Sequence, residues 1–302
     1  MSDRPIIAVG HAGLDYIYKV AAFPPSPTKL RALAHIASGG GMAANAAATA
    51  ARLGAPVALW SRIGEDPAGR IIRDQLSIGG VDAAHVKAFA TARSPTSAVI
   101  VDQKGERLIV SEDDHGLPLD AGWLPVADVA KAAVVMSDLT WLEGTLAAFR
   151  AAREKAIPTL LDIDLGSGVL LPKVIDFTDY AIFSAPALHR FVEGTNDAER
   201  LKSLLELGVR HAGVTLGSKG YVWIARDGKG GTQPAFPVEA VDTTGAGDAF
   251  HGAFAWALAH GKEDADCARF ASAVAAMSCR GLGARAALPT RAEAEEFLRA
   301  QG

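Results

Sequence analysis

The sequence has few cysteines, no long hydrophobic run and no large excess of one charge. Only Cys267 and Cys279 occur among the 302 residues, both in alanine-rich surroundings. We expect both to be buried, reduced thiols, because two cysteines cannot supply a disulfide framework for a chain of this length. No stretch approaches the roughly 20 unbroken apolar residues that a membrane-spanning helix needs. Disulfide-stabilised and membrane-spanning proteins are therefore disfavoured.

The charge balance disfavours two further classes of partner. The chain carries 30 Lys and Arg against 34 Asp and Glu, a formal net charge of −4. A slightly acidic protein has no broad attraction for nucleic acid or for anionic lipid, so neither is an expected partner. The start of the chain shows no charged segment followed by an apolar core and a cleavage site, so we expect a cytoplasmic protein.

What the sequence does contain is enough apolar residue, 49% of the total, to bury a large core. Short runs rich in Val, Ile and Leu alternate with amphipathic stretches along the chain. This alternation predicts a layered α/β fold, with a mainly parallel sheet covered by helices on both faces. The expected strands are residues 6–9, 57–61, 133–136, 159–162, 180–183 and 212–215, and the expected helices are 42–53, 68–78, 142–155 and 198–207.

Two segments break this alternation. Residues 16–37 and 97–110 are typical of strands with no helix between them, and their apolar residues recur with period two. We expect them to form a small antiparallel sheet with one covered face. A sheet this small needs something to cover, so we interpret it as a lid over the site. The expected organisation is a single domain, 1–302, with lid segments at about 12–38 and 94–113.

The most informative stretch is Asp-Thr-Thr-Gly-Ala-Gly-Asp at 242–248, which directly precedes a clear helical pattern. Its small residues should lie at a helix N-terminus, where backbone N–H groups lack partners and the helix dipole attracts an anion. Gly245, Ala246 and Gly247 have no bulk to obstruct a phosphate lying against the backbone. We therefore predict an anion hole at these three residues.

Asp248 falls in the first turn of that helix, beside the predicted anion hole. Its carboxylate can face a substrate hydroxyl held in line with a γ-phosphoryl group. Phosphoryl transfer has a loose transition state, so a protein mainly supplies alignment, charge neutralisation and a carboxylate that accepts the proton. This predicts Asp248 as a general base. On spacing alone, a helix cap after a tight glycine turn explains the same residues.

Two separated signatures resemble those of one enzyme family. Residues 242–248 resemble the C-terminal signature of the ribokinase, or PfkB-type, carbohydrate kinases. Residues 39–45, Gly-Gly-Gly-Met-Ala-Ala-Asn, are similar to the N-terminal signature of the same family. The likeness covers nearly the whole chain, from residue 6 to residue 289.

This resemblance carries expectations for fold and cofactors. It implies a ribokinase-like fold of three layers, with a central sheet, helices on both faces and a β-sheet lid that often serves as a dimer interface. It also implies ATP and Mg²⁺ as cofactors, a small sugar as substrate and a homodimer formed through the lid. Within the family, the sequence looks most like the sulfofructose kinase type, at residues 183–188, 245–252 and 283–286.

The resemblance further implies a set of sugar-binding residues. Asp15 matches a position that binds sugar hydroxyls, which suits a carboxylate that can accept two hydrogen bonds. Gly40, Gly41 and Asn45 match positions that contact the sugar, through close backbone approach and through an amide that both donates and accepts. Lys29 matches a substrate-side lysine of the sulfofructose kinase type, and a solvated surface lysine is the alternative.

The sequence departs from that type at the residues that would bind a sulfonate. An asparagine and an arginine are expected there, and Ser111 and Thr140 occupy those positions instead. Without a bidentate arginine, recognition of an anionic sugar tail is not indicated. A neutral ketose or related sugar is as consistent with the sequence as an acidic one.

On the nucleotide side, residues 214–220 match the strand and turn that the family places near the ATP phosphates and ribose. The resemblance selects Thr215, Gly217 and Gly220 as nucleotide-binding residues. Taken alone, this strand and its glycine turn would be a weak signal. No Walker-type phosphate loop and no complete dinucleotide-binding glycine motif occurs in the sequence.

Cation binding is the least determined feature. Many relatives use an Asn and a Glu to organise magnesium through water, and here Ala185 and Leu188 occupy those positions. Magnesium is still expected, because it binds chiefly through phosphates and water. Asp162 and Asp164 are candidate substitutes at the end of a strand, although structural capping is a competing explanation. Asp242 matches a position that helps to hold a monovalent cation in ribokinases, so K⁺ is a further candidate.

The sequence thus predicts an ATP-dependent kinase that phosphorylates a hydroxyl of a small sugar, a ketose or sugar derivative. Two alternatives stay open. A nucleoside kinase of the same family would keep the chemistry and change only the acceptor. A non-catalytic sugar-binding protein would account for the missing Asn and Glu, but it would not explain an intact Gly245–Asp248 stretch.

Overall fold

A computed structural model describes residues 4–103, 105–112, 116–166 and 168–301, and its core is a nine-stranded sheet. The strand order is β13-β12-β11-β10-β9-β8-β1-β4-β5, and only β12 and β13 at one edge are antiparallel to their neighbours. The strands are β1 (Ile6–Val9), β4 (Val57–Gly64), β5 (Val86–Phe89), β8 (Val134–Ser137), β9 (Thr159–Ile163), β10 (Tyr180–Ser184), β11 (His211–Thr215), β12 (Tyr221–Ala225) and β13 (Gly230–Gln233).

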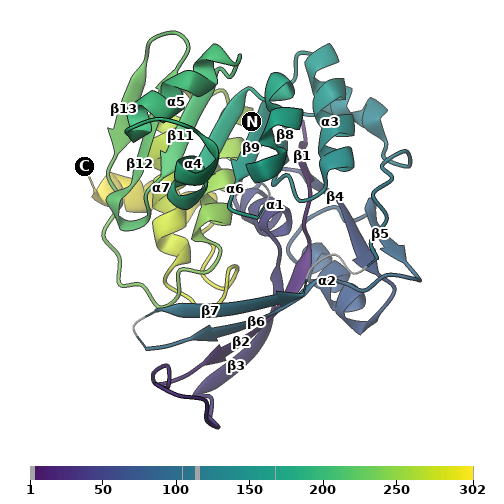
Figure 1. Ribbon diagram of the computed structural model, residues 1–302, viewed down its shortest axis with the longest axis vertical. Coiled ribbons are helices and arrows are strands. Elements are labelled where there is room, and N and C mark those ends of the chain that lie inside the picture. The colour runs from purple at the N-terminus through teal and green to yellow at the C-terminus, as the bar shows by residue number, and fades with distance from the viewer. Residues whose placement is uncertain (1–3, 104, 113–115, 167, 302) are drawn as a thin grey trace.

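Helices cover both faces of this sheet, as Figure 1 shows. Successive residues of β1 point to opposite faces, so Ile6 and Ala8 join one apolar cluster and Ile7 and Val9 join the other. The first cluster is completed by α1 (Met42–Arg52), α2 (Pro67–Ile78), α6 (Ala246–Ala259), α7 (Asp264–Ser278) and α8 (Arg291–Ala300), and the second by α3 (Leu142–Glu154), α4 (Ala185–Phe191) and α5 (Asp197–Glu206). Short 3₁₀ turns are η1 (Val126–Lys131), η2 (Gly168–Lys173), η3 (Ile175–Phe177) and η4 (Gly217–Lys219).

A second sheet of four strands projects from this body and forms the lid (Figure 1). Its strand order is β3-β2-β6-β7. The prediction of a purely antiparallel sheet is wrong, because β2 and β6 run parallel. Parallel pairing is possible here because the chain returns through α1, β4, α2 and β5 before β6 begins. The strands are β2 (Gly13–Lys19), β3 (Ala34–Gly40), β6 (Thr96–Val101) and β7 (Arg107–Glu112), and residues 104 and 113 of the predicted lid segments lie outside the described residues.

The two faces of the lid have different neighbours. Ile17, Val99 and Val101 on the inner face form a buried cluster against Leu282 of the body. Alternate residues of a strand point to the same side, so Asp15, two residues before Ile17 on β2, also faces inward. The lid therefore carries its buried polar residue on the side that covers the body.

The layered α/β fold predicted from the sequence is confirmed, and every expected strand and helix is present with ends shifted by a few residues. Cys267 and Cys279 are buried and unbridged, as predicted. Among the described helices, none has both the length and the apolar character needed to cross a bilayer.

Candidate active site

The candidate site lies where the carboxyl ends of the parallel strands meet the starts of α1 and α6. Strands β9, β10 and β11 run parallel, so their carboxyl ends share one edge of the sheet. Helices α1 and α6 pack against each other beside that edge. In open α/β sheets this edge is the usual place for a ligand. The lid joins the body beside the same sheet edge, because β3 leads directly into α1.

The start of α6 leaves backbone N–H groups available. Gly245 takes a left-handed conformation, φ 74°, and caps the helix without a side-chain hydrogen bond. Within the described residues, no backbone carbonyl accepts a hydrogen bond from the N–H groups of Gly247 and Asp248. The position in front of Gly247 is open, since a methyl group added there would meet no other atom. The three predicted anion-hole residues thus lie at an open helix N-terminus, where an anion is stabilised.

Asp248 is connected to a buried chain of polar groups. The Nδ2–H of Asn45 donates to Asp248 Oδ2 at 2.7 Å, and the Nε–H of Arg285 donates to Asn45 Oδ1 at 2.8 Å. A second guanidinium nitrogen, Nη2, donates to the carbonyl of Gly40 at 3.3 Å. The structure therefore brings together residues from the N-terminal signature, the C-terminal signature and the last loop of the body.

The surroundings of Asp248 weaken its acidity. Burial and the nearby carboxylate of Asp162 raise the pKa of Asp248 to about 7, against the opposing effect of the Asn45 hydrogen bond. A carboxylate with such a pKa is a stronger base than an ordinary one and is still largely ionised just above neutral pH. Burial likewise lowers the pKa of Arg285, to about 10, while Asp15 and Asp248 oppose that shift. Arg285 thus remains charged at neutral pH.

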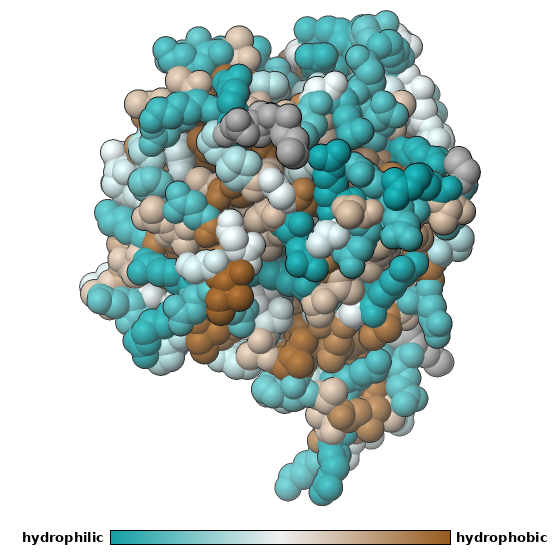
Figure 2. Space-filling model, turned by 180° about the vertical axis from the view of Figure 1, so that it is seen from behind, coloured by the Kyte–Doolittle hydropathy of each residue, from teal (hydrophilic) through white to brown (hydrophobic). Residues whose placement is uncertain are grey.

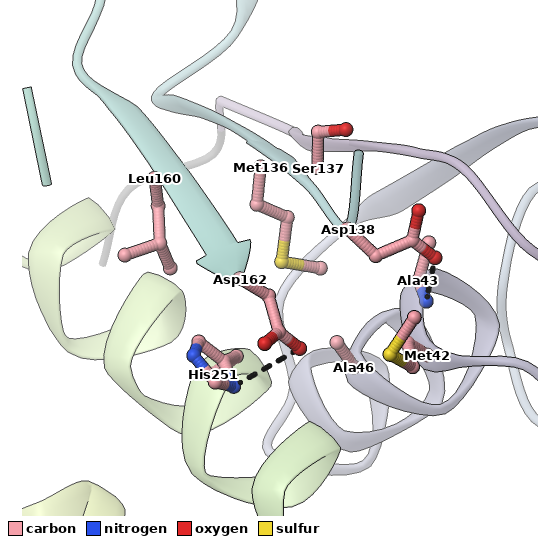
Figure 3. A pocket seen from close by; sticks show the side chains of 9 residues that line it. All are labelled: Met42, Ala43, Ala46, Met136, Ser137, Asp138, Leu160, Asp162 and His251. Atoms are coloured by element: carbon pink, nitrogen blue, oxygen red, sulfur yellow. Dashed lines mark hydrogen bonds and ion pairs between the residues drawn. The ribbon is translucent and has the colours of Figure 1, made fainter. Parts of the chain in front are cut away.

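A small cavity of about 10 Å³ lies behind Asp248, between the sheet and helices α1 and α6 (Figure 3). His251 lines it and places Nδ1 2.7 Å from the carbonyl of Gly247 and 3.2 Å from Asp162 Oδ2. Burial raises the pKa of Asp162 well above its usual range and lowers the pKa of His251. Burial thus disfavours the charged form of each member of this contact. His251 lies on α6, three residues after Asp248, and is a packed residue.

Asp138 is a buried carboxylate that the sequence did not single out. It follows β8, and its Oδ2 accepts hydrogen bonds from the backbone N–H groups of His11, at 2.8 Å, and Ala43, at 2.9 Å. Its Oδ1 accepts from the hydroxyl of Thr140 at 2.7 Å. Asp138 therefore ties the end of β1 to the start of α1, and Thr140, which the sequence resemblance aligned with an expected sulfonate-binding position, is held against it.

The predicted sugar-binding residues fall into two groups. Asp15 is buried on the inner face of the lid, and a methyl group on Gly40 would overlap its carboxylate. Gly41 begins α1 with φ 89°, a conformation that favours glycine. Arg285 connects these residues, because it donates to Asn45 and to the Gly40 carbonyl and is influenced by the charge of Asp15. Lys29 does not join them: it is exposed in the loop between β2 and β3, the lower tip of the lid in Figure 1.

The predicted nucleotide-binding residues lie at the carboxyl end of β11. Thr215 is its last residue and donates its hydroxyl to the carbonyl of Phe183 at 3.2 Å. Gly217 and Gly220 flank the single turn η4, both with positive φ. A methyl group on Gly220 would overlap the carbonyl of Gln233, so the turn packs tightly on the chain that follows β13. The three residues share one sheet edge with the start of α6.

The predicted cation-binding residues each have protein partners. Asp162 contacts His251, and Asp164 accepts a hydrogen bond from the Ser184 hydroxyl at 2.7 Å. Asp242 is buried and accepts from the N–H and the hydroxyl of Thr244 and from the N–H of Gly283. Across the described residues, no group of three or more His, Cys, Asp or Glu side chains is arranged to hold a metal ion. The cation assignments of these three aspartates therefore stay predictions.

Ser111 belongs to the inner face of the lid. It pairs with Ser97 on β6, which in turn pairs with Asp15 on β2, and the two serine hydroxyl oxygens are 3.3 Å apart. This row of short polar side chains extends from Asp15 across three strands. It would suit hydroxyl groups of a ligand, because each member can donate or accept.

From the sequence, Arg285 belongs only to a stretch, 283–286, that resembles the family, and no role is predicted for it. No local spacing could predict its contact with Asn45, because 240 residues separate the two. The available signal was an arginine inside an apolar glycine- and alanine-rich segment, a charge that packing does not explain. Asp138 gave no comparable signal, because an aspartate after a strand is usually a solvated loop residue.

Comparisons with known proteins agree with this geometry. The family model described as "pfkB family carbohydrate kinase" matches residues 3–291. The ribokinase of Haemophilus influenzae is 28% identical, over 98% of each chain. The crystal structure of a putative ribokinase from Agrobacterium tumefaciens superposes with a TM-score of 0.94 at 33% identity, over 99% of this chain and 98% of that one.

A further solved structure, the Arabidopsis thaliana ribokinase complexed with ribose and ATP, superposes with a TM-score of 0.83 at 25% identity, over 98% of this chain and 99% of that one. Because the matching family model spans nearly all of the sequence, the chain belongs to the pfkB family of carbohydrate kinases. The resemblance proposed from the two signatures is confirmed at this level.

Proposed function

We propose that the protein transfers the γ-phosphoryl group of ATP to a hydroxyl of a small sugar, with Asp248 as the general base. The observation that carries this proposal is the start of α6, where open backbone N–H groups stand beside a carboxylate with a raised pKa. An anion-binding helix end and a neighbouring base are the two elements that phosphoryl transfer to a hydroxyl requires of the protein.

In the proposed reaction, Asn45 holds Oδ2 of Asp248 and leaves Oδ1 without a protein partner among the described residues. The acceptor hydroxyl donates its hydrogen bond to that oxygen. As the oxygen attacks phosphorus, its proton passes to the carboxylate, and the bond to the leaving ADP breaks. The N–H groups of Gly247 and Asp248 stabilise charge on the transferred group, because within the described residues no backbone carbonyl accepts from them.

ATP supplies the phosphoryl group, and Mg²⁺ neutralises phosphate charge when it is bound. The described residues suit an ion held mainly by phosphates and water, since no three-residue metal cluster is present. Thr215, Gly217 and Gly220 would contact the nucleotide from the neighbouring strand end. Support for ATP comes from the Arabidopsis relative, whose structure contains it.

The acceptor is a sugar in this proposal because polar groups from the lid and the body converge above the base. Asp15 and Ser97 on the lid face Asn45 and Arg285 on the body, and together they offer both acceptors and donors to a polyhydroxyl ligand. The same relative contains ribose. The alternative acceptor is a nucleoside, which would use the same base and anion hole.

The test measures ADP release from Mg-ATP with a panel of neutral ketoses, aldoses, acidic sugars and nucleosides. We expect stimulation by one or more sugars, and we expect Asp248→Asn to keep sugar and ATP binding while losing turnover by about three orders of magnitude or more. Stimulation by nucleosides alone would show that the acceptor is a nucleoside and not a sugar. Sugar binding without turnover by any compound would favour a binding protein, and a loss of less than about tenfold in Asp248→Asn would show that another group is the base.

We also propose that the outer face of the lid forms a homodimer interface. Tyr18, Ile100 and Leu108 pair directly across three strands, and Val110 lies two residues along β7 from Leu108, on the same face. Tyr18 is 39% exposed, Leu108 50% and Val110 63%, so the row is apolar and uncovered in the single chain. Figure 2 shows hydrophobic side chains gathered where the lid meets the body, above the polar tip of the lid.

Sedimentation of Leu108→Asp tests the dimer. The wild-type protein should sediment at twice the 31.4 kDa chain mass and the variant at the chain mass. Ile78→Asp is the control, because Ile78 is 87% exposed on α2 and should tolerate a charge without any change in assembly. A monomeric wild type, or a dimer that survives Leu108→Asp, would remove the lid from consideration as the interface.

A further inference from the structure

Arg285 occupies an unusual position for a charged residue. Its guanidinium lies between the carboxylates of Asp15 and Asp248, and both influence its charge. It rests against the glycine segment that joins the lid to α1, so closely that a methyl group on Gly39 would overlap it. The charge is therefore enclosed by residues of the site rather than directed to solvent.

The hydrogen bonds of Arg285 fix the orientation of Asn45. An asparagine amide can be turned either way round, with its oxygen or its nitrogen toward a given neighbour. The Nε–H of arginine is only a donor, so the atom of Asn45 that faces it at 2.8 Å must be the oxygen Oδ1. The other amide atom, Nδ2, is then necessarily the one that faces Asp248 Oδ2, at 2.7 Å. The arginine thereby decides that Asp248 receives a hydrogen bond there.

We infer that Arg285 is a positioning residue for the base, which acts through the amide of Asn45 to orient the carboxylate of Asp248 and to keep it ionised. This inference rests on the proposed function, because it assigns Arg285 a part in activating that base. It concerns this chain's own residues, since each contact from Arg285 to Asn45 and from Asn45 to Asp248 joins two of its side chains. The second contact, from Nη2 to the Gly40 carbonyl, holds the guanidinium in place.

The same contacts predict the direction in which the pKa of Asp248 changes when Arg285 is removed. Loss of Arg285 removes a positive charge close to Asp248 and frees Asn45 to turn its oxygen toward the carboxylate. Both changes disfavour the ionised form, so the pKa of Asp248 should rise further above its ordinary value. A base must be ionised to accept a proton, so activity at neutral pH should fall and should be partly recovered at higher pH.

The first experiment compares pH profiles of kcat for the wild type, Arg285→Met and Arg285→Lys. Arg285→Met should shift the acid limb upward by about one pH unit and lower kcat at pH 7 by at least about tenfold, with a smaller loss at pH 9. Arg285→Lys should lie between the two, because it keeps the charge and loses the planar fork. KM for ATP should change little.

Arg62→Met is the matched control. Arg62 is a buried arginine and Arg285 a partly buried one, but Arg62 packs over the ring of Trp141 and donates to the carbonyls of Leu117 and Pro118. It should lower the melting temperature and leave the pH profile in place. An Arg285→Met variant that behaves like this control would overturn the inference. A rise in KM for the sugar with an unchanged pH profile of kcat would also overturn it, because Arg285 would then be a substrate contact.

A double-mutant cycle tests the route through Asn45. If Arg285 acts through that amide, Arg285→Met should add less than about twofold to the loss caused by Asn45→Ala, whereas independent effects would multiply. An NMR titration of the Asp248 carboxyl carbon, without substrates, separates this inference from the proposed function. An upward shift in Arg285→Met supports the inference even if no sugar is phosphorylated, and an unchanged titration refutes it even if the wild type is an active kinase.

Discussion

Helices α6 and α8 begin in opposite ways. At α8, Thr290 accepts a hydrogen bond from the N–H of Glu293, and the Glu293 carboxylate accepts from the N–H of Thr290. At α6, Gly245 offers no side chain, and within the described residues no backbone carbonyl accepts from the N–H groups of Gly247 and Asp248. A capped helix end satisfies its own donors and is stable alone. An uncapped helix start lacks that stabilisation, and its N–H donors are left for an anion. We therefore expect changes at α8 to affect stability and changes at the start of α6 to affect activity.

The largest effect should come from giving the start of α6 a side chain. Gly245→Ala adds a methyl group that would overlap Ala284 and strains a backbone with φ 74°. Displacing the N–H groups of the anion hole should lower kcat/KM by about a hundredfold to a thousandfold in an ADP-release assay.

Gly261→Ala is the control for backbone strain. Gly261 follows the other end of α6 with φ 69°, and a methyl group there meets no other atom. It should lose about 1 kcal/mol of stability and keep its activity. Equal activity losses in the two variants would mean that the open helix start has no catalytic role.

The second prediction concerns pH. Because the pKa of Asp248 is raised to about 7, and a general base works only when ionised, kcat/KM should fall about tenfold per pH unit below that value. The rate measured at pH 5 should be about a hundredfold lower than the plateau above pH 8. Far-ultraviolet circular dichroism at each pH would check that the protein stays folded. A flat profile down to pH 5 would show that the base is a group with an ordinary carboxylate pKa.

The third prediction is that the ionised Asp248 carboxylate lowers the free energy of unfolding. A carboxyl group whose pKa is higher in the folded state than in the unfolded state binds more protons when folded, so stability falls as pH rises through the window from 3.8 to about 7. Asp248→Asn should therefore be more stable than the wild type at pH 8, by on the order of 2 kcal/mol for a partly buried group, and nearly equal to it near pH 4. Urea unfolding at both pH values measures this, and a variant less stable than wild type at pH 8 would contradict it.

The smallest effect should appear at the capped helix. Thr290→Ala removes the acceptor for the Glu293 N–H and should cost about 1 kcal/mol of unfolding free energy. Because α8 completes the core away from the site, kcat and KM should stay within about twofold of the wild type. Thermal unfolding and the ADP-release assay check the two parts, and a large kinetic effect would show that the two helix starts are coupled.

Much of the fold followed from patterns that are local in sequence. Buried strands such as β1 are continuous apolar runs, and the small-residue start of α6 is visible in seven consecutive letters. The lid strands were also recognised, but their pairing was not. Whether β2 pairs with β6 in parallel depends on the path of the chain through α1, β4, α2 and β5, which no local pattern encodes.

The candidate site was predictable only where a motif contained it. Asp248 and its glycines could be selected because the motif predicts a helix start there, and α6 does begin at Ala246. Arg285 and Asp138 could not be identified, because their roles come from contacts with residues 240 and 127 positions away. Lys29 shows the opposite case. Its position in the sequence matches a substrate-side lysine, but in the structure it is exposed in the loop at the tip of the lid.

The glycine segment between β3 and α1 has a mechanical consequence. Gly40 is the last residue of a lid strand and Gly41 caps the helix that carries Asn45, so one residue separates the lid from that helix. A tilt of the lid would therefore also displace the first turn of α1, which holds the amide that donates to Asp248. On the proposed function, a raised lid would then weaken the proton acceptor and so slow the transfer of phosphate to water.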